Sequence, residues 1–168
     1  MILNNKVSQR LEIIGFKGAV KKSTSRIQGN KSIEFTIAGY QYPETKSLKE
    51  KFDYDANWLM CELKYSDAEI CETYKDTCLL TYELEEMADA FSEILDGSED
   101  GYISEFMEPY LKVAAARVDE KIVVIFQYVY DTTDGVWKDR KIKTLLSQES
   151  ATEMVQSLKD LVSEYSER

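Results

Sequence analysis

The sequence predicts an α+β fold in which a largely antiparallel, curved sheet of about seven to eight strands is covered by two helices. Several short segments alternate apolar and polar side chains, which is the period of a half-buried strand. Two longer segments repeat apolar residues at the spacing of an amphipathic helix. With 168 residues, 43% of them apolar, the chain has the size of one domain with one core.

We therefore expect residues 1–168 to form a single domain with three parts. Residues 1–31 are a weakly patterned N-terminal extension, in which only Leu11, Ile13 and Phe16 alternate as in a short strand. Residues 32–97 make a first strand-strand-helix half. Residues 98–168 make a second, strand-rich half that ends in a helix.

The first well-marked strand runs from Ser32 to Tyr42, where Ile33, Phe35 and Ile37 alternate with polar or small residues. Pro43 ends it, because proline cannot donate a hydrogen bond to a neighbouring strand. The charged segment 44–55 follows as a linker.

The central unit begins with a strand over residues 59–65, in which Leu59, Cys61, Leu63 and Tyr65 share one face. A turn over residues 66–68 leads to a partner strand over residues 70–77. Leu79 and Leu80 then carry the chain under the following helix.

That helix is predicted to begin at Tyr82, with Thr81 as its N-cap and Gly97 as its stop. Glu83 and Glu85 lie where the helix dipole favours negative charge. Its apolar stripe consists of Leu84, Met87, Ala88, Phe91, Ile94 and Leu95, and such a stripe packs into a core far more often than it binds a ligand.

The second half is predicted to contain a short strand over residues 102–107, a break at Glu108 and Pro109, and an antiparallel meander. The meander strands cover residues 110–118, 121–130 and 136–146. The closing helix has two candidate caps, Ser147, or Ser150 with Glu153 as a capping box. CLLTYELEEM and TLLSQESATEM form a weak internal repeat, since each leads from a strand into a helix.

The net charge of −10 is concentrated in the middle of the chain. Residues 1–51 contain 10 Lys+Arg and 4 Asp+Glu, residues 52–110 contain 2 and 17, and residues 111–168 contain 9 and 10. An acidic field of this kind repels nucleic acid and attracts basic proteins. The simpler interpretation is that these side chains keep the domain in solution.

The residue inventory excludes several chemistries. The chain has no histidine, which removes Ser-His-Asp and Cys-His nucleophiles. Cys61, Cys71 and Cys78 form no C-x-x-C pair and are expected to be packing residues or plain thiols. No apolar run is long enough to span a bilayer, and the N-terminus lacks a signal-peptide core, so we expect a cytoplasmic protein without cofactor or metal.

The segment DGSEDGYISEFME, residues 96–108, partly matches a calcium-binding EF-hand loop. Asp96, Ser98, Asp100 and Gly101 occupy positions one, three, five and six. The twelfth position, which requires a bidentate glutamate, is Met107. An acidic turn from a helix into a strand explains the same residues without a metal.

Four short runs resemble the WapI-type immunity family of bacterial contact-dependent inhibition systems. They are GYQYPE at Gly39–Glu44, YDANWL at Tyr54–Leu59, CLLTYEL at Cys78–Leu84 and EPYL at Glu108–Leu111. Their order and spacing are similar to those of the family, and the resemblance covers about residues 33–168. The motif residues themselves are expected to be structural.

The resemblance implies a non-enzymatic cytoplasmic protein that binds and neutralises the C-terminal domain of a secreted toxin. The toxin would be a basic nuclease, to which an acidic protein could be steered. The partner-facing residues are predicted on the first long helix and just beyond it: Glu85, Glu86, Asp89, Glu93, Asp96, Glu99 and Asp100. Alternatives are a structural or regulatory protein-binding module and a calcium-binding protein that uses residues 96–108.

Overall fold

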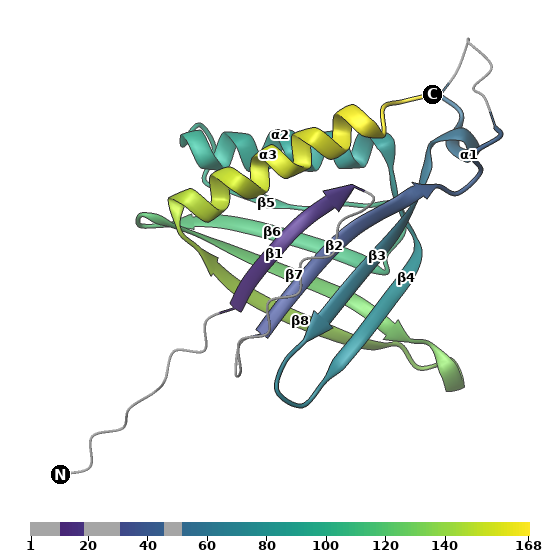
Figure 1. The fold of residues 1–168 in the computed structure, drawn as a ribbon, viewed down its shortest axis with the longest axis horizontal. Helices are drawn as coiled ribbons and strands as arrows, with labels where there is room; N and C mark the ends of the chain where they lie inside the picture. Colours follow the sequence, from purple (N-terminus) through teal and green to yellow (C-terminus); the bar gives the residue numbers. More distant parts are fainter. Residues whose placement is uncertain (1–10, 19–30, 46–51) are drawn as a thin grey trace.

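The computed structural model describes residues 11–18, 31–45 and 52–168, and its strands form two four-stranded sheets (Figure 1). Sheet A has the order β1 (Leu11–Gly18), β2 (Lys31–Tyr40), β3 (Trp58–Ser66) and β4 (Cys71–Leu80). Neighbouring strands are antiparallel except β1 and β2, which are parallel. The weak alternation from Leu11 thus corresponds to an edge strand.

Sheet B has the order β5 (Gly101–Ile103), β6 (Leu111–Val118), β7 (Lys121–Asp131) and β8 (Lys138–Leu146). All of its pairs are antiparallel, which confirms the predicted meander. A short 3₁₀ helix, Thr133–Gly135, lies between β7 and β8. The predicted strand over residues 102–107 is shorter than expected and ends at Ile103.

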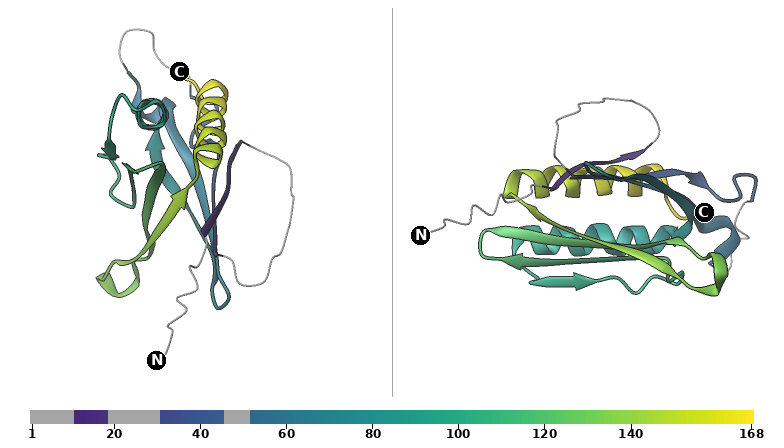
Figure 2. Two further views of the ribbon diagram at one scale, coloured as in Figure 1. Left: turned by 90° about the vertical axis from the view of Figure 1, so that its left-hand side faces the viewer. Right: turned by 90° about the horizontal axis from the view of Figure 1, so that it is seen from below.

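Three helices connect and cover the strands: α1 (Tyr54–Asn57), α2 (Thr81–Asp96) and α3 (Gln148–Glu164). The two long helices lie side by side along one border of the sheets, as Figures 1 and 2 show. α2 packs against β4, β5 and β6, and α3 packs against β1, β7 and β8. α1 was not anticipated from the sequence.

The α+β class, the number of strands and the predominantly antiparallel pairing are confirmed. The strands, however, divide into two facing sheets rather than one curved sheet (Figure 2). α2 lies between β4 and β5 in the chain, and these two strands belong to different sheets. The two sheets bury their apolar faces against each other and against the helices in one core cluster.

The core consists of alternate residues of β2, β3, β6, β7 and β8, the end of β4, and the apolar stripes of α2 and α3. Ile37, Leu59, Leu84 and Leu158 are fully buried within it. Cys61 and Cys78 also lie in this core, whereas Cys71 is exposed at the start of β4. The hydrogen bond with Cys61, reinforced by burial, raises the pKa of the Cys78 thiol, so both residues are packing thiols.

Candidate protein-binding surface

α2 is the rigid element that presents the predicted partner-facing residues. One side of it is buried, including Leu84, Met87, Phe91 and Ile94. The helix ends at Gly97, whose φ of 85° is left-handed and whose N–H donates to the Glu93 carbonyl oxygen at 3.0 Å. The helix stop predicted at Gly97 is therefore confirmed.

The opposite side of α2 and the turn after it are uniformly acidic. We call this the acidic surface, and it consists of Glu85, Glu86, Asp89, Glu93, Asp96, Glu99 and Asp100. All seven residues are exposed. On the helix they recur at three- and four-residue intervals, so their carboxylates are neighbours. The structure thus brings the predicted set together on α2 and the turn that follows it.

Little positive charge neutralises the acidic surface. Among the described residues, the ion pairs within 4 Å are Lys64–Glu62, Lys138–Asp131 and Arg140–Glu72, and none of them includes a member of the acidic surface. Arg117 of β6 is close, but its guanidinium donates to the carbonyl oxygens of Ile94 and Leu95 at the end of α2. The carboxylates of this surface therefore remain available to a basic partner.

Asp96 has a local structural role within this surface. Its carboxylate accepts hydrogen bonds from the Ser98 N–H at 2.8 Å and the Ser98 hydroxyl at 2.6 Å. These two hydrogen bonds are the main reason why the pKa of Asp96 is lowered. Residues 96–100 thus form a tight turn into β5. Within the described chain, no group of three His, Cys, Asp or Glu residues is placed to hold a metal ion.

Glu83 differs from its acidic neighbours because it is buried. One carboxylate oxygen accepts from the Leu80 N–H at 2.8 Å and the other from the Met107 N–H at 2.5 Å. Burial raises its pKa despite these two bonds. Glu83 therefore ties the start of α2 to the segment before β6, a role that the sequence pattern did not reveal.

The predicted cap of α2 is wrong. Thr81 is the first residue of the helix and Leu80 occupies the N-cap position, so the helix also begins one residue before the predicted Tyr82. The Thr81 hydroxyl donates instead to the Asn57 side-chain oxygen at 3.0 Å, and both residues are buried. The Thr81 hydroxyl thus bonds to a residue distant in sequence instead of capping the helix.

Asn57 joins three distant segments of the chain. It ends α1, and its side-chain oxygen also accepts from the Arg168 N–H at 2.8 Å. Arg168 in turn donates to the Pro43 carbonyl oxygen at 2.9 Å, and its guanidinium lies 3.5 Å from the centre of the Tyr40 ring. Three of the four recognised sequence runs therefore meet at this point.

The family comparison agrees with those runs. The model of the immunity protein WapI-like family matches residues 25–166. The chain belongs to this family. No curated protein and no solved structure gave a match. In this WapI-like chain, Asn57 and Thr81 are buried and hydrogen-bonded to each other, which gives these two motif residues a structural role. Tyr42 and Tyr54 of the recognised runs are exposed.

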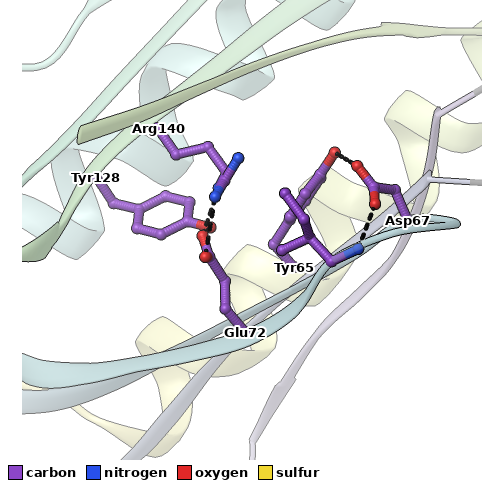
Figure 3. A network of polar contacts seen from close by, with 6 residues as sticks. Tyr65, Asp67, Glu72, Tyr128 and Arg140 are labelled. Carbon is purple, nitrogen blue, oxygen red and sulfur yellow. Dashed lines mark hydrogen bonds and ion pairs between the residues drawn. The ribbon is translucent and has the colours of Figure 1, made fainter. Parts of the chain in front are cut away.

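A second polar cluster in this WapI-like immunity protein links the two sheets (Figure 3). The Glu72 carboxylate on β4 accepts from the Tyr128 hydroxyl at 2.6 Å and pairs with the Arg140 guanidinium through both oxygens. The rings of Tyr65 and Tyr130 each lie 5.2 Å from the Arg140 guanidinium carbon. The sequence analysis missed this cluster.

Hydrogen bonds within this cluster and its burial shift the pKa values of its members. The hydrogen bonds from Arg140 hold the pKa of Glu72 below its usual range. Burial, aided by the hydrogen bond to Glu72, raises the pKa of Tyr128, and burial also raises that of Tyr65 to about 12. The cluster thus holds one ion pair and neutral phenols at physiological pH, which suits a structural link rather than proton transfer.

No helix among the described residues is both long and apolar enough to cross a membrane.

Proposed function

We propose that this chain is an immunity protein that binds and neutralises a cognate toxin domain without catalysing a reaction. Membership of the WapI-like immunity family, over residues 25–166, carries the proposal. Immunity proteins generally act by binding, and the absence of histidine is consistent with that mode. We place this activity in the cytoplasm of the toxin-producing cell.

The acidic surface is our candidate for the toxin contact. Its carboxylates share one exposed helix face and are free of close ion pairs among the described residues. A domain that cleaves RNA or DNA binds phosphates through basic residues. An acidic face would attract such a domain, speed its association and compete with its substrate.

The direct test is binding to the C-terminal domain of the toxin encoded beside this chain, measured by calorimetry at low and high salt. Reversing Glu85, Glu86, Asp89 and Glu93 to Lys is expected to weaken binding about 100-fold, since four attractive charges become repulsive. The affinity of the wild-type protein should fall with salt.

A matched control reverses four exposed carboxylates on the neighbouring, antiparallel helix α3: Glu149, Glu153, Asp160 and Glu164. This variant has the same net charge, so it should bind nearly as the wild type does. If both variants lose affinity equally, the effect is one of net charge. If the α2 variant binds the toxin domain as tightly as the wild type, the acidic surface is not the contact. If the wild-type protein neither binds nor inhibits the toxin domain, the proposed function is wrong.

A further inference from the structure

The outer face of sheet A has the chemistry of a solvated surface. Glu34 on β2 lies across from Lys64 on β3, and Glu62 lies between Thr36 and Lys75. Opposite charges and hydroxyl groups thus alternate across the strands. This is the usual pattern where an antiparallel sheet faces water on one side.

The outer face of sheet B is apolar where β5, β6 and β7 adjoin, whereas β8 carries exposed lysines. We call the apolar part the apolar surface, and it consists of Ile103, Ala114, Ala116, Val123, Ile125 and Leu145. Ile103 is 77% exposed and Leu145 is 50% exposed. The helices lie elsewhere, because α2 packs on the other side of β5 and β6, where Phe91 contacts Tyr102. Contiguous exposed apolar side chains mark interaction sites.

Strand register arranges this surface in two rows that each cross all four strands. The rows are Ile103, Ala114, Ile125, Lys143 and Gly101, Ala116, Val123, Leu145. In both rows β6 contributes only alanine, whereas β7 contributes a branched side chain. This difference in height leaves a hollow of about 550 Å³ over β5, β6 and β7.

We propose that a second copy of this chain covers the apolar surface, sheet against sheet, with the twofold axis parallel to the strands and between β6 and β7. This axis reverses the order of the strands in the second copy. Ala114 then faces Ile125 of the second copy, and Ala116 faces its Val123. Each hollow receives the raised side chains of the other copy, as a self-complementary interface requires.

Charge supports this axis and this occupant. β8 presents the exposed side chains of Lys141 and Lys143, whereas the exposed carboxylates of Glu99, Asp100 and Glu105 flank β5. The proposed axis brings the acidic edge of each copy over the lysine-bearing strand of the other. An axis across the strands would instead place lysines over lysines.

The dimer is expected to be of modest affinity. Four strands spaced by about 4.8 Å give a sheet face of roughly 500 Å² per copy, which is at the low end for specific interfaces. We expect a dissociation constant in the micromolar range, as for other weak interfaces of this size. Glu99 and Asp100 of the acidic surface lie at the edge of the proposed dimer, whereas Glu85, Glu86, Asp89 and Glu93 on α2 stay uncovered. The dimer therefore does not depend on the toxin contact proposed for α2.

Sedimentation velocity of the full chain, from about 1 μM to about 500 μM, tests the dimer over the range expected for this area. The mean mass of the wild-type protein should rise towards that of two copies. Ile103→Lys places a lysine over Lys143 of the second copy and should weaken dimerisation at least about tenfold, whereas Ile103→Glu should weaken it less. Val136→Lys, at a 61% exposed site outside the apolar surface, is the matched control.

A charge swap identifies the second copy as the occupant. Adding Lys143→Glu to Ile103→Lys creates an opposite-charge pair across the proposed interface and should restore dimerisation. A wild-type protein that is monomeric over the whole range overturns the proposal, as does an Ile103→Lys variant that dimerises normally. Protection of β5 and β6 from hydrogen exchange only when the toxin domain is bound would also overturn it, because a different partner would then cover this face.

Discussion

At the scale of single residues, the surroundings of a carboxylate decide what it does in this protein. Glu72 bridges the two sheets through Arg140 and Tyr128. Glu83 is buried and accepts two backbone N–H groups. Asp89 is exposed on α2 among other carboxylates. All three fall in the acidic middle of the sequence, so charge content alone does not separate structural carboxylates from available ones.

Replacing Glu72 with Gln is expected to lower the free energy of unfolding at neutral pH by about 1–3 kcal/mol, because Arg140 loses its charged partner in a partly buried site. The pKa of Glu72 is lowered in the folded protein. Its contribution is therefore present above the ordinary glutamate pKa of about 4.3 and is lost as the pH falls through the lowered value. Urea denaturation as a function of pH should show the two proteins converging in acid.

The control for this prediction is Glu62→Gln on the outer face of sheet A. Glu62 pairs with Lys64, whose side chain is 52% exposed, so its loss should change the free energy of unfolding by no more than about 0.5 kcal/mol. A stability difference between wild type and Glu72→Gln that persists unchanged into acid would contradict the assigned ion pair.

At the scale of elements, the start of α2 depends on contacts that are distant in sequence. Leu80 is the N-cap but has no hydrogen-bonding side chain, so the capping acceptor comes from Glu83 within the helix. The same carboxylate accepts from Met107, 24 residues further on. The first turn of the helix is thereby joined to the segment that leads into β6.

Glu83→Ala is expected to lower the free energy of unfolding by about 2–4 kcal/mol, because it leaves two backbone N–H groups without an acceptor. Glu83→Gln should have an intermediate effect, since an amide supplies only one acceptor oxygen. Urea denaturation at constant pH measures both changes. Glu85→Ala, at an exposed position on the same turn, should change stability by less than about 0.5 kcal/mol, and equal losses at the two positions would refute the capping role.

The sequence predicted those elements whose pattern is local. The alternation of Ile33, Phe35 and Ile37 predicted β2. Ser147, one of the two N-cap candidates for the closing helix, is the N-cap of α3. What the sequence could not predict depends on contacts over long separations. Thr81 is a residue type that often caps helices, but it bonds to Asn57. The division of the strands into two sheets likewise depends on tertiary contacts rather than on a local pattern.

The candidate site shows the same limit. Helical spacing was enough to predict that the carboxylates of α2 share an exposed face. It could not reveal that Glu72 and Arg140, 68 residues apart, form an ion pair across the sheets. The sequence analysis also did not predict the apolar surface. Both faces of β6 and β7 carry apolar residues, so their sequence resembles that of a fully buried strand.

At the scale of the whole molecule, the three exposed faces have different chemistry. Sheet A is outwardly polar, sheet B is outwardly apolar over β5, β6 and β7, and α2 is acidic. α2 contains six Asp and Glu residues and no Lys or Arg, so like charges are neighbours on this helix. An arrangement of this kind costs stability in the isolated protein, and the proposed contact with a basic partner would account for it.

Local arrangement rather than net charge should therefore control thermal stability. Asp89→Gln removes repulsion with Glu85, Glu86 and Glu93 and is expected to raise Tm by about 1–3 °C at low salt, with a smaller gain at high salt. Glu149→Gln changes the net charge equally but removes a carboxylate from the first turn of α3, where the helix dipole favours it, and should lower Tm slightly. Thermal unfolding followed by circular dichroism at two salt concentrations compares the variants. If both substitutions raise Tm equally, net charge dominates and the acidic surface carries no special cost.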